Sequence, residues 1–310
     1  MIIAEVQRAA SILNDELKKV KRTVSRKAIL EEAWMIVFVL CGIRCAGLLS
    51  KLQTDNENIS ALMNALSLIL NNDVENVLIL VHVPSQQTFI VNRKLLFTRL
   101  NRTTNHAFLA IDHAEVNAKV HGNMPSSLKK MLEEIEMVLG EEGRLSVQII
   151  SLTCEHSLQS SNSAKTGVAL AGWLLEYPLV YYFSQSENFQ LRASIHSASS
   201  IVKLLSNCSD DWEEADDMQM NNLAGKDLNA FCVDLLIRSE SEIVQNILQF
   251  TIPVSAIHPT AEAIGMRNGS LEDIRQNLTK HFDDRIQIQK GNQMSIRVDT
   301  KQIRMDRVAI

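Results

Sequence analysis

The sequence has no long hydrophobic run. Its longest apolar stretch covers residues 33–43 and is closed by Arg44. A helix that crosses a bilayer needs about 20 apolar residues in succession, so this stretch predicts a buried helix and excludes a transmembrane one. Residues 2–5 (IIAE) also lack the basic and then apolar regions that begin a signal peptide. We therefore expect a soluble, intracellular protein without a membrane partner.

The sequence also has no large excess of charge of either sign. The 31 Lys and Arg residues nearly balance the 36 Asp and Glu residues, and the formal net charge is −5. A nucleic-acid-binding domain carries a basic excess, so we expect no nucleic-acid partner. Basic residues do gather within residues 18–27, which leaves a nucleic-acid or anionic-membrane patch open. No aromatic residue is interleaved with them, however, which favours a solvated helix end.

The five cysteines do not form a recognisable pattern. They are Cys41, Cys45, Cys154, Cys208 and Cys232. An odd number of scattered cysteines without a signal peptide predicts free thiols in a reducing compartment, the cytoplasm or the nucleus. Residues 154–156 (CEH) come nearest to a metal site. They have no second Cys or His pair at ligand spacing, so we expect no metal ion.

Signatures of nucleotide and nucleophile chemistry are missing as well. The chain has no Gly-x-Gly-x-x-Gly dinucleotide motif and no phosphate-binding loop. It also has no Gly-x-Ser-x-Gly elbow, which would place a serine nucleophile on a sharp turn. We therefore expect no cofactor, and the sequence assigns no reaction.

No linker rich in Pro, Gly or Ser and no internal repeat divides the 310 residues. Apolar residues make up 46% and charged residues 22% of the chain, as in an average globular protein. We expect a single α/β domain over residues 1–310. Its predicted parts are N-terminal helices (1–45), an α/β body (46–208), an acidic loop (209–225) and a C-terminal α+β part (226–310). The acidic loop favours a solvated segment, with an interaction site as the alternative.

Helix-like and strand-like patterns alternate along the first two-thirds of the chain. Residues 77–81 (VLILV) are continuously aliphatic, as in a strand buried on both faces. Residues 125–140 place six apolar side chains on one helical face. Residues 108–111 and 145–152 predict further strands. The alternation predicts an α/β protein built from a mixed sheet with helices packed on it.

The segment from residue 174 to residue 183 (LLEYPLVYYF) joins a helix to a strand. A helical pattern over residues 166–175 runs into Pro178, which removes a backbone donor and disfavours helical geometry in the residue before it. The helix is therefore predicted to end at or just before Tyr177. Residues 179–183 are all apolar, which favours a strand inside the sheet over a strand at its edge.

The last third has a more antiparallel, hairpin-like character. Residues 191–195 alternate between apolar and polar side chains, as in a half-solvated antiparallel strand. Residues 240–250 have apolar side chains at helical spacing and predict a helix. A further helix is expected to begin after Ser270 with a capping box. A C-terminal hairpin is predicted over residues 286–298.

The best candidate site is a set of polar residues at predicted strand ends. Asp112 and His113 follow the strand at 108–111, and His82 lies at the end of the central apolar run. Ligand sites of α/β sheets form beyond the carboxyl ends of the strands, and a carboxylate beside an imidazole can do acid–base work. The alternative is that Asp112 caps a turn and His113 is solvated.

Three segments carry a likeness to a known family. They are residues 41–49 (CGIRCAGLL), 77–91, and 172–181 (GWLLEYPLVY). In these segments the chain resembles an uncharacterised animal protein family, that of the human chromosome 1 open reading frame 74 product. The resemblance leads us to expect a glycine where this chain has Glu176. It implies an intracellular α/β protein, and it supplies no substrate, cofactor or catalytic residue.

Two functions of different classes follow from these observations. A full-sized core without a recognisable nucleotide, metal or nucleophile signature favours a non-catalytic interaction or scaffold protein with an unknown protein partner. The alternative is a small-molecule enzyme of unrecognised type, acting at His82, Asp112 and His113. Convergence of these three side chains in a pocket would favour the enzyme, and their dispersal would favour the interaction protein.

Overall fold

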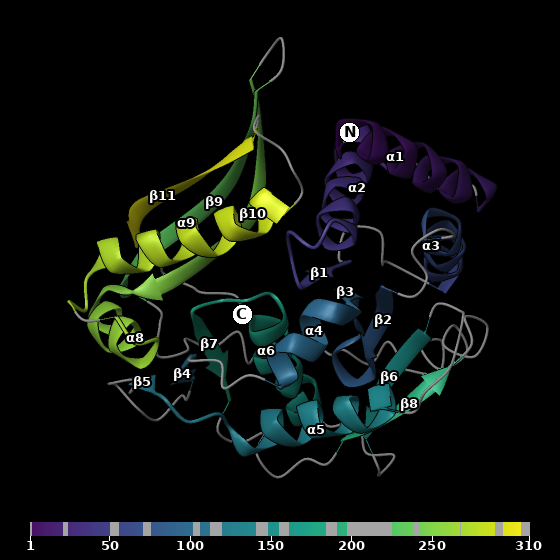
Figure 1. The fold of residues 1–310 in the computed structure, drawn as a ribbon. Helices are drawn as coiled ribbons and strands as arrows, with labels where there is room; N and C mark the ends of the chain where they lie inside the picture. Colours follow the sequence, from purple (N-terminus) through teal and green to yellow (C-terminus); the bar gives the residue numbers. More distant parts are fainter. Residues whose placement is uncertain are drawn as a thin grey trace. The chain divides into compact units, whose positions relative to one another are not determined.

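The chain divides into two compact units, whose helices and strands are labelled in Figure 1. The computed structural model describes residues 2–20, 24–49, 56–70, 76–101, 106–111, 120–140, 148–154, 161–183, 191–196, 225–238, 242–266, 268–288 and 294–304. Unit 1 comprises Met1–Arg102, Lys129–Gly167 and Asn188–Asp211, and unit 2 comprises Thr103–Leu128, Val168–Glu187 and Trp212–Ile310. The described residues form eight α-helices and three sheets, which confirms the predicted α/β class. That the whole chain is one domain stays a prediction.

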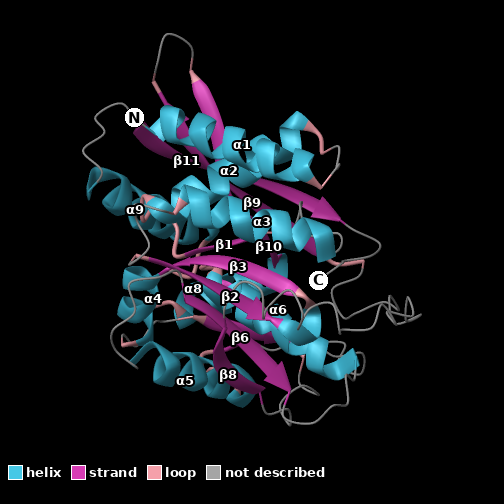
Figure 2. Ribbon diagram, turned by 90° about the vertical axis from the view of Figure 1, so that its right-hand side faces the viewer, coloured by secondary structure: helices cyan, strands magenta, loops and turns pink. Residues whose placement is uncertain are grey.

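Unit 1 is built around a five-stranded mixed sheet, sheet A. Its strands are β1 (Ala46–Leu48), β2 (Val77–His82), β3 (Gln87–Asn92), β6 (Gln148–Cys154) and β8 (Leu191–His196). Its helices are α1 (Ile2–Lys19), α2 (Arg26–Leu40), α3 (Asn56–Ile69), α4 (Arg93–Leu100) and most of α5 (Ser126–Gly140). The strand order is β1-β3-β2-β6-β8, which Figure 2 displays from one edge of the sheet to the other. Only the β2–β6 pair is parallel within this described sheet.

Strand β2 lies in the middle of sheet A, as its continuous apolar sequence predicts. All six of its residues are buried. Ile79 is opposite Ile90 of β3 on one side and Ile149 of β6 on the other. Helix α3 and helices α4 and α5 lie on opposite sides of the sheet (Figure 1). The predicted strand is therefore confirmed, because side chains are buried on both of its faces.

The described residues of unit 2 form two three-stranded sheets. Sheet B consists of β4 (Ala107–Ala110), β5 (Val120–His121) and β7 (Leu179–Tyr182), in the order β5-β4-β7. Sheet C consists of β9 (Asp227–Ile237), β10 (Ile243–Pro253) and β11 (Met294–Arg304), in the order β10-β9-β11, and it is antiparallel throughout. Helices α8 (Ile257–Ala263) and α9 (Leu271–Ile288) lie between β10 and β11 in the sequence. Helix α6 (Ser161–Leu174) begins in unit 1 and ends in unit 2.

The helix predicted over residues 240–250 is wrong, because this segment forms strand β10. The register of β10 against β9 shifts between Asn246 and Leu248, which is a β-bulge. A bulge inserts one extra residue into a strand and places two neighbouring side chains on the same face. Ile247 and Leu248 are accordingly both buried. The bulge breaks the alternation of the strand and imitates a helical spacing of apolar residues.

The hairpin predicted over residues 286–298 is also wrong. Helix α9 continues through Ile288, and β11 pairs with β9 instead of an adjacent segment. The predicted start of α9 is confirmed. Ser270 Oγ accepts the backbone N–H of Asp273 at 3.1 Å, and the Asp273 carboxylate accepts the backbone N–H of Ser270 at 2.9 Å. These reciprocal bonds form a capping box.

The end of helix α6 is confirmed, but the placement of the strand after it is wrong. Backbone bonds from Glu176 to Trp173 and from Tyr177 to Gly172 close the helix. Strand β7 pairs only with β4 among the described strands, so it is an outer strand of sheet B. Val180 is nevertheless fully buried, and Gly172 of α6 lies against it. A continuous apolar pattern reports side-chain burial on both faces and not the number of hydrogen-bonded neighbours.

Candidate functional site

His82, the last residue of β2, is the one predicted site residue that the structure describes. Its side chain is fully buried in unit 1. The backbone N–H of Ser85 donates to His82 Nδ1 at 3.3 Å, so Nδ1 is the unprotonated nitrogen of the ring. Nε2 therefore carries the proton and donates it to Thr166 Oγ1, at 2.8 Å. Ser85 Oγ lies 2.6 Å from Nδ1, which makes the hydroxyl the donor of that bond.

The His82 ring is neutral at physiological pH. Burial lowers its pKa to about 3, because the charged imidazolium would lose its hydration. Both ring nitrogens are occupied by hydroxyl groups or backbone of unit 1. The ring thus joins the β2–β3 turn to helix α6, from which Thr166 comes.

Gly167 allows the backbone of α6 to approach this turn. A Cβ atom at Gly167 would lie 2.5 Å from Ser85 Oγ, 2.8 Å from Gln87 Oε1 and 3.0 Å from His82 Nδ1. Any larger residue would push the turn away from the helix. Gln87 is opposite His82 across the β2–β3 pair, and its Oε1 is buried without a hydrogen-bond donor among the described residues. We call His82, Ser85, Gln87 and Thr166 the His82 cluster.

The His82 cluster permits two chemical roles. A serine hydroxyl that donates to an imidazole has the geometry of an activated nucleophile. A base with a pKa far below neutrality abstracts protons poorly, however, because an effective general base titrates near the working pH. The same contacts also cap the turn, since His82 accepts the N–H of Ser85 at the start of the 3₁₀ helix η1 (Val83–Ser85).

Asp112 and His113 lie outside the described residues, and so does the acidic stretch 209–217. Their convergence with His82 stays a prediction. The partners of His82 were missed by sequence reasoning. Ser85 follows His82 by three residues in a turn and could have been considered. Thr166 is 84 residues away from His82, and no local pattern indicates that they meet.

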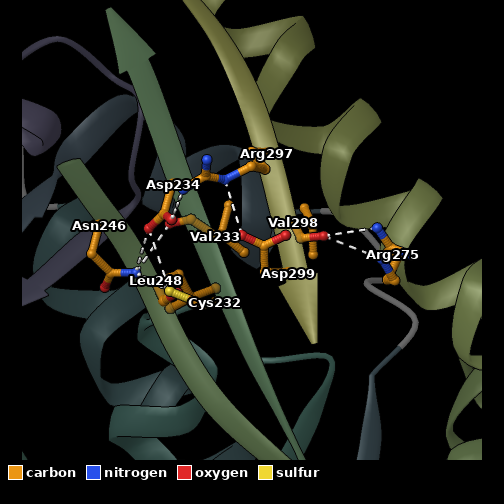
Figure 3. Close-up of polar contacts among 9 residues, drawn as sticks. All are labelled: Cys232, Val233, Asp234, Asn246, Leu248, Arg275, Arg297, Val298 and Asp299. Atoms are coloured by element: carbon orange, nitrogen blue, oxygen red, sulfur yellow. Dashed lines mark hydrogen bonds and ion pairs between the residues drawn. The ribbon is translucent and has the colours of Figure 1, made fainter. Parts of the chain in front are cut away.

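A second polar network lies on sheet C of unit 2 (Figure 3). The Asn246 amide, at the bulge of β10, donates to Asp234 Oδ1 at 3.0 Å and to Cys232 Sγ at 2.9 Å. Arg297 of β11 forms ion pairs with Asp234 at 3.1 Å and with Asp299 at 2.9 Å. Burial alone would raise the pKa of Asp234, but hydrogen bonds from Asn246 and Arg297 outweigh it and hold that pKa below its usual value. Asp234 is therefore an anion, and it links the central strand β9 to Asn246 of β10 and Arg297 of β11.

The Cys232 thiol ionises less readily than the thiol of a reactive cysteine. Burial, together with the hydrogen bond and the negative charge of Asp234, raises the pKa of the Cys232 thiol to about 11. The thiolate is the nucleophile and the metal ligand, so this thiol is unreactive at neutral pH. Within the described residues, Cys41, Cys45 and Cys232 form no disulfide bond, as predicted. Free thiols at Cys154 and Cys208 stay a prediction.

The described ranges contain no candidate for a metal centre or a membrane span. No group of three or more His, Cys, Asp and Glu side chains there is arranged to hold a metal ion. No described helix is both long enough and apolar enough to cross a membrane.

The comparisons with known proteins identify a family whose function is unknown. No curated protein and no solved structure matches the chain. A family model described as "Domain of unknown function (DUF4504)" matches residues 15–214, which is more than half of the chain. The matched residues include all of sheet A and the His82 cluster, and they end before sheet C. The chain therefore belongs to the DUF4504 family, a domain of unknown function.

Proposed function

We propose that this chain is a non-catalytic interaction or scaffold protein that acts in the cytoplasm or nucleus. We also propose that, within its family, it is similar to the animal proteins represented by the human chromosome 1 open reading frame 74 product. The observation that supports it most is the state of His82. Its imidazole lies at the carboxyl end of the central strand, where α/β enzymes place their chemistry. It is fully buried and neutral, and it is engaged at both nitrogens in joining a turn to a helix.

The expected partner is a protein with an apolar surface, not a nucleic acid or a membrane. Two large apolar side chains of unit 1 are well exposed, Phe97 of α4 at 56% and Met137 of α5 at 64%. The two helices are linked, because Arg93 of α4 donates to the carbonyl of Leu139 of α5 at 3.3 Å. Phe97 lies one turn from Arg93, and Met137 lies two residues from Leu139. Exposed large apolar side chains on two linked helices support a protein interaction surface there.

The test compares partners captured by crosslinking in cells. Phe97→Glu combined with Met137→Glu should abolish the crosslinks of specific partners that the wild-type chain forms. The matched control is Leu68→Glu on α3, because Leu68 is 51% exposed and belongs to the same unit. Partners that are retained by the control and lost by the double variant support the proposal. Identical partner sets for all three chains would contradict this surface, and a wild-type chain without specific crosslinks would contradict the function.

The second candidate is a small-molecule enzyme, which the 2.6 Å contact between Ser85 Oγ and His82 Nδ1 favours. In that case Ser85 is the nucleophile, His82 accepts its proton, and Thr166 orients the ring. Asp112 and His113 are the further candidates for acid–base work. Ser85 is only partly buried, so a small electrophile can approach it.

A fluorophosphonate probe tests the second candidate, because it reacts with activated serine hydroxyls. Labelling at Ser85 that is lost in Ser85→Ala and in His82→Asn would establish the enzyme and refute the non-catalytic proposal. Thr98→Ala serves as the control, since Thr98 is partly exposed and its hydroxyl bonds to the carbonyl of Lys94 in its own helix. An unlabelled wild-type chain that melts cooperatively supports the structural role of the cluster.

A further inference from the structure

The two outer strands of sheet C, β10 and β11, each have an edge that faces away from β9. Strands β10 and β11 each span 11 residues, and each pairs with β9 on one side only among the described strands. An outer strand exposes unpaired backbone N–H and C=O groups, to which a strand of another chain can bind. Strands of this length usually carry a feature that prevents such pairing.

Helix α9 satisfies outward backbone groups of β11 with its side chains. Arg275 donates to the carbonyl of Val298 through Nε at 3.2 Å and Nη2 at 3.0 Å (Figure 3). In Figure 3 this carbonyl points away from β9 and toward Arg275. The carboxylate of Asp283 accepts the backbone N–H of Ile296. Residues 296 and 298 are two apart, so their backbone groups point to the same side of the strand.

A further hydrogen bond holds the Arg275 side chain in place on α9. Arg275 Nη1 also bonds to Glu272 at 2.9 Å, which orients the guanidinium toward the strand. Arg275 and Asp283 are eight residues apart and lie on the same flank of the helix. One residue supplies donors and the other supplies an acceptor. Together they imitate the hydrogen bonds that a fourth strand would make with β11.

The edge of β10 is protected by different means. The bulge between Asn246 and Leu248 interrupts the regular spacing of its backbone groups. The hydroxyl of Tyr181 donates to the carbonyl of Thr251 at 2.8 Å. Side-chain contacts are therefore found on both outer strands of sheet C, which argues against a chance contact at β11 alone.

We propose that α9 guards the outer edge of β11, with Arg275 and Asp283 occupying the backbone groups to which a β-strand of a second copy of this chain would bind. The guard keeps unit 2 from pairing edge to edge with another copy. It does not depend on the partner surface at Phe97 and Met137, because all of its residues belong to unit 2.

The test removes the guard and measures self-association of the full chain. Arg275→Ala combined with Asp283→Ala should associate at least about tenfold more tightly than the wild type in sedimentation experiments over a concentration series. The control is Lys280→Ala combined with Asp284→Ala, which removes one basic and one acidic side chain from the exposed side of the same helix and leaves both edge contacts. The control should sediment as the wild type does.

A third substitution identifies the edge that pairs. Thr300 is two residues beyond Val298, so its N–H also points away from β9. Proline at this position therefore removes a donor to which an added strand would bind, and it leaves the bonds between β11 and β9 in place. Adding Thr300→Pro to the unguarded variant should restore the sedimentation of the wild type. Association that survives Thr300→Pro would overturn the proposal, as would an unguarded variant that sediments as the wild type does.

Amide exchange supplies a second readout in case the double variant does not fold. Asp283→Asn keeps the size of the side chain but weakens the acceptor for the Ile296 amide. In this single variant the Ile296 amide should exchange faster than in the wild type, while the amides of β9 remain unchanged. An unchanged exchange rate at Ile296 would overturn the guard role of Asp283.

Discussion

The carboxylate of Glu176 receives two hydrogen bonds from Arg285, at 2.6 and 2.7 Å, although the backbone of Glu176 has a positive φ of 66°. His281 adds a third contact at 3.3 Å. The residue that ends a helix in this left-handed conformation is usually a glycine, because a Cβ atom is strained there. The resemblance also led us to expect a glycine at this position. Here the strained residue is a glutamate that binds helix α9 within unit 2.

Substitutions at Glu176 should separate the ion pair from the backbone strain. Glu176→Ala keeps the strain and leaves Arg285 without its carboxylate, so the free energy of unfolding should fall by about 3–5 kcal/mol. Glu176→Gly loses the same pair but relieves the strain, so its loss should be about 1 kcal/mol smaller. Urea denaturation measures both values. Equal losses for the two variants would contradict strain at this position.

The buried His82 should make the stability of the protein depend on pH. Its folded pKa of about 3 lies below the value of 6.5 expected in the unfolded chain, so the unfolded state binds the proton more readily. The contribution of His82 is fully present above about pH 6.5 and is lost at about 1.4 kcal/mol per pH unit below it. Between pH 6.5 and 5, the wild type should lose about 2 kcal/mol more than His82→Asn. Denaturant midpoints with parallel pH profiles would show that the ring is not protected from protonation.

The cysteines should titrate as five free thiols in the denatured chain. In the native chain, Cys232 should react with a disulfide reagent at pH 8 about 100-fold more slowly than an ordinary thiol, because a pKa of about 11 leaves little thiolate. Comparison with Cys232→Ser assigns the slow phase to this residue. A count of one or three thiols would indicate disulfides and contradict the reducing compartment.

The core of unit 1 should depend on Ile79 and Leu132, which are 2% and 6% exposed. Ile79→Ala and Leu132→Ala should each lower the free energy of unfolding by about 2–5 kcal/mol, the usual effect of truncating a buried aliphatic side chain. Met137→Ala, at an exposed position of the same helix as Leu132, should change it by less than about 0.5 kcal/mol. If the three variants have the same denaturant midpoint, Ile79 and Leu132 are not core residues.

Several elements could be derived from the sequence because their causes are local. Ser25 and Ser270 lie three residues before the N–H groups that they cap, so the beginnings of α2 and α9 can be found without a fold. The aliphatic run of β2 indicates burial on both faces wherever the strand lies in a sheet. Pro178 limits helix α6 through its own ring.

Other features were decided only by the tertiary structure. The bulge at Asn246 changes which side chains of β10 share a face, and it exists only against β9. Strand β7 has the apolar sequence of an inner strand, but the pairing of the described strands makes it an outer one. His82 was selected from the sequence by its place at a strand end. Its burial, its tautomer and its lowered pKa depend on Thr166, 84 residues away. Short-range patterns determine caps and burial because the interacting groups lie within a few residues of each other. Strand order and polar contacts between distant segments require the chain to fold before the groups meet.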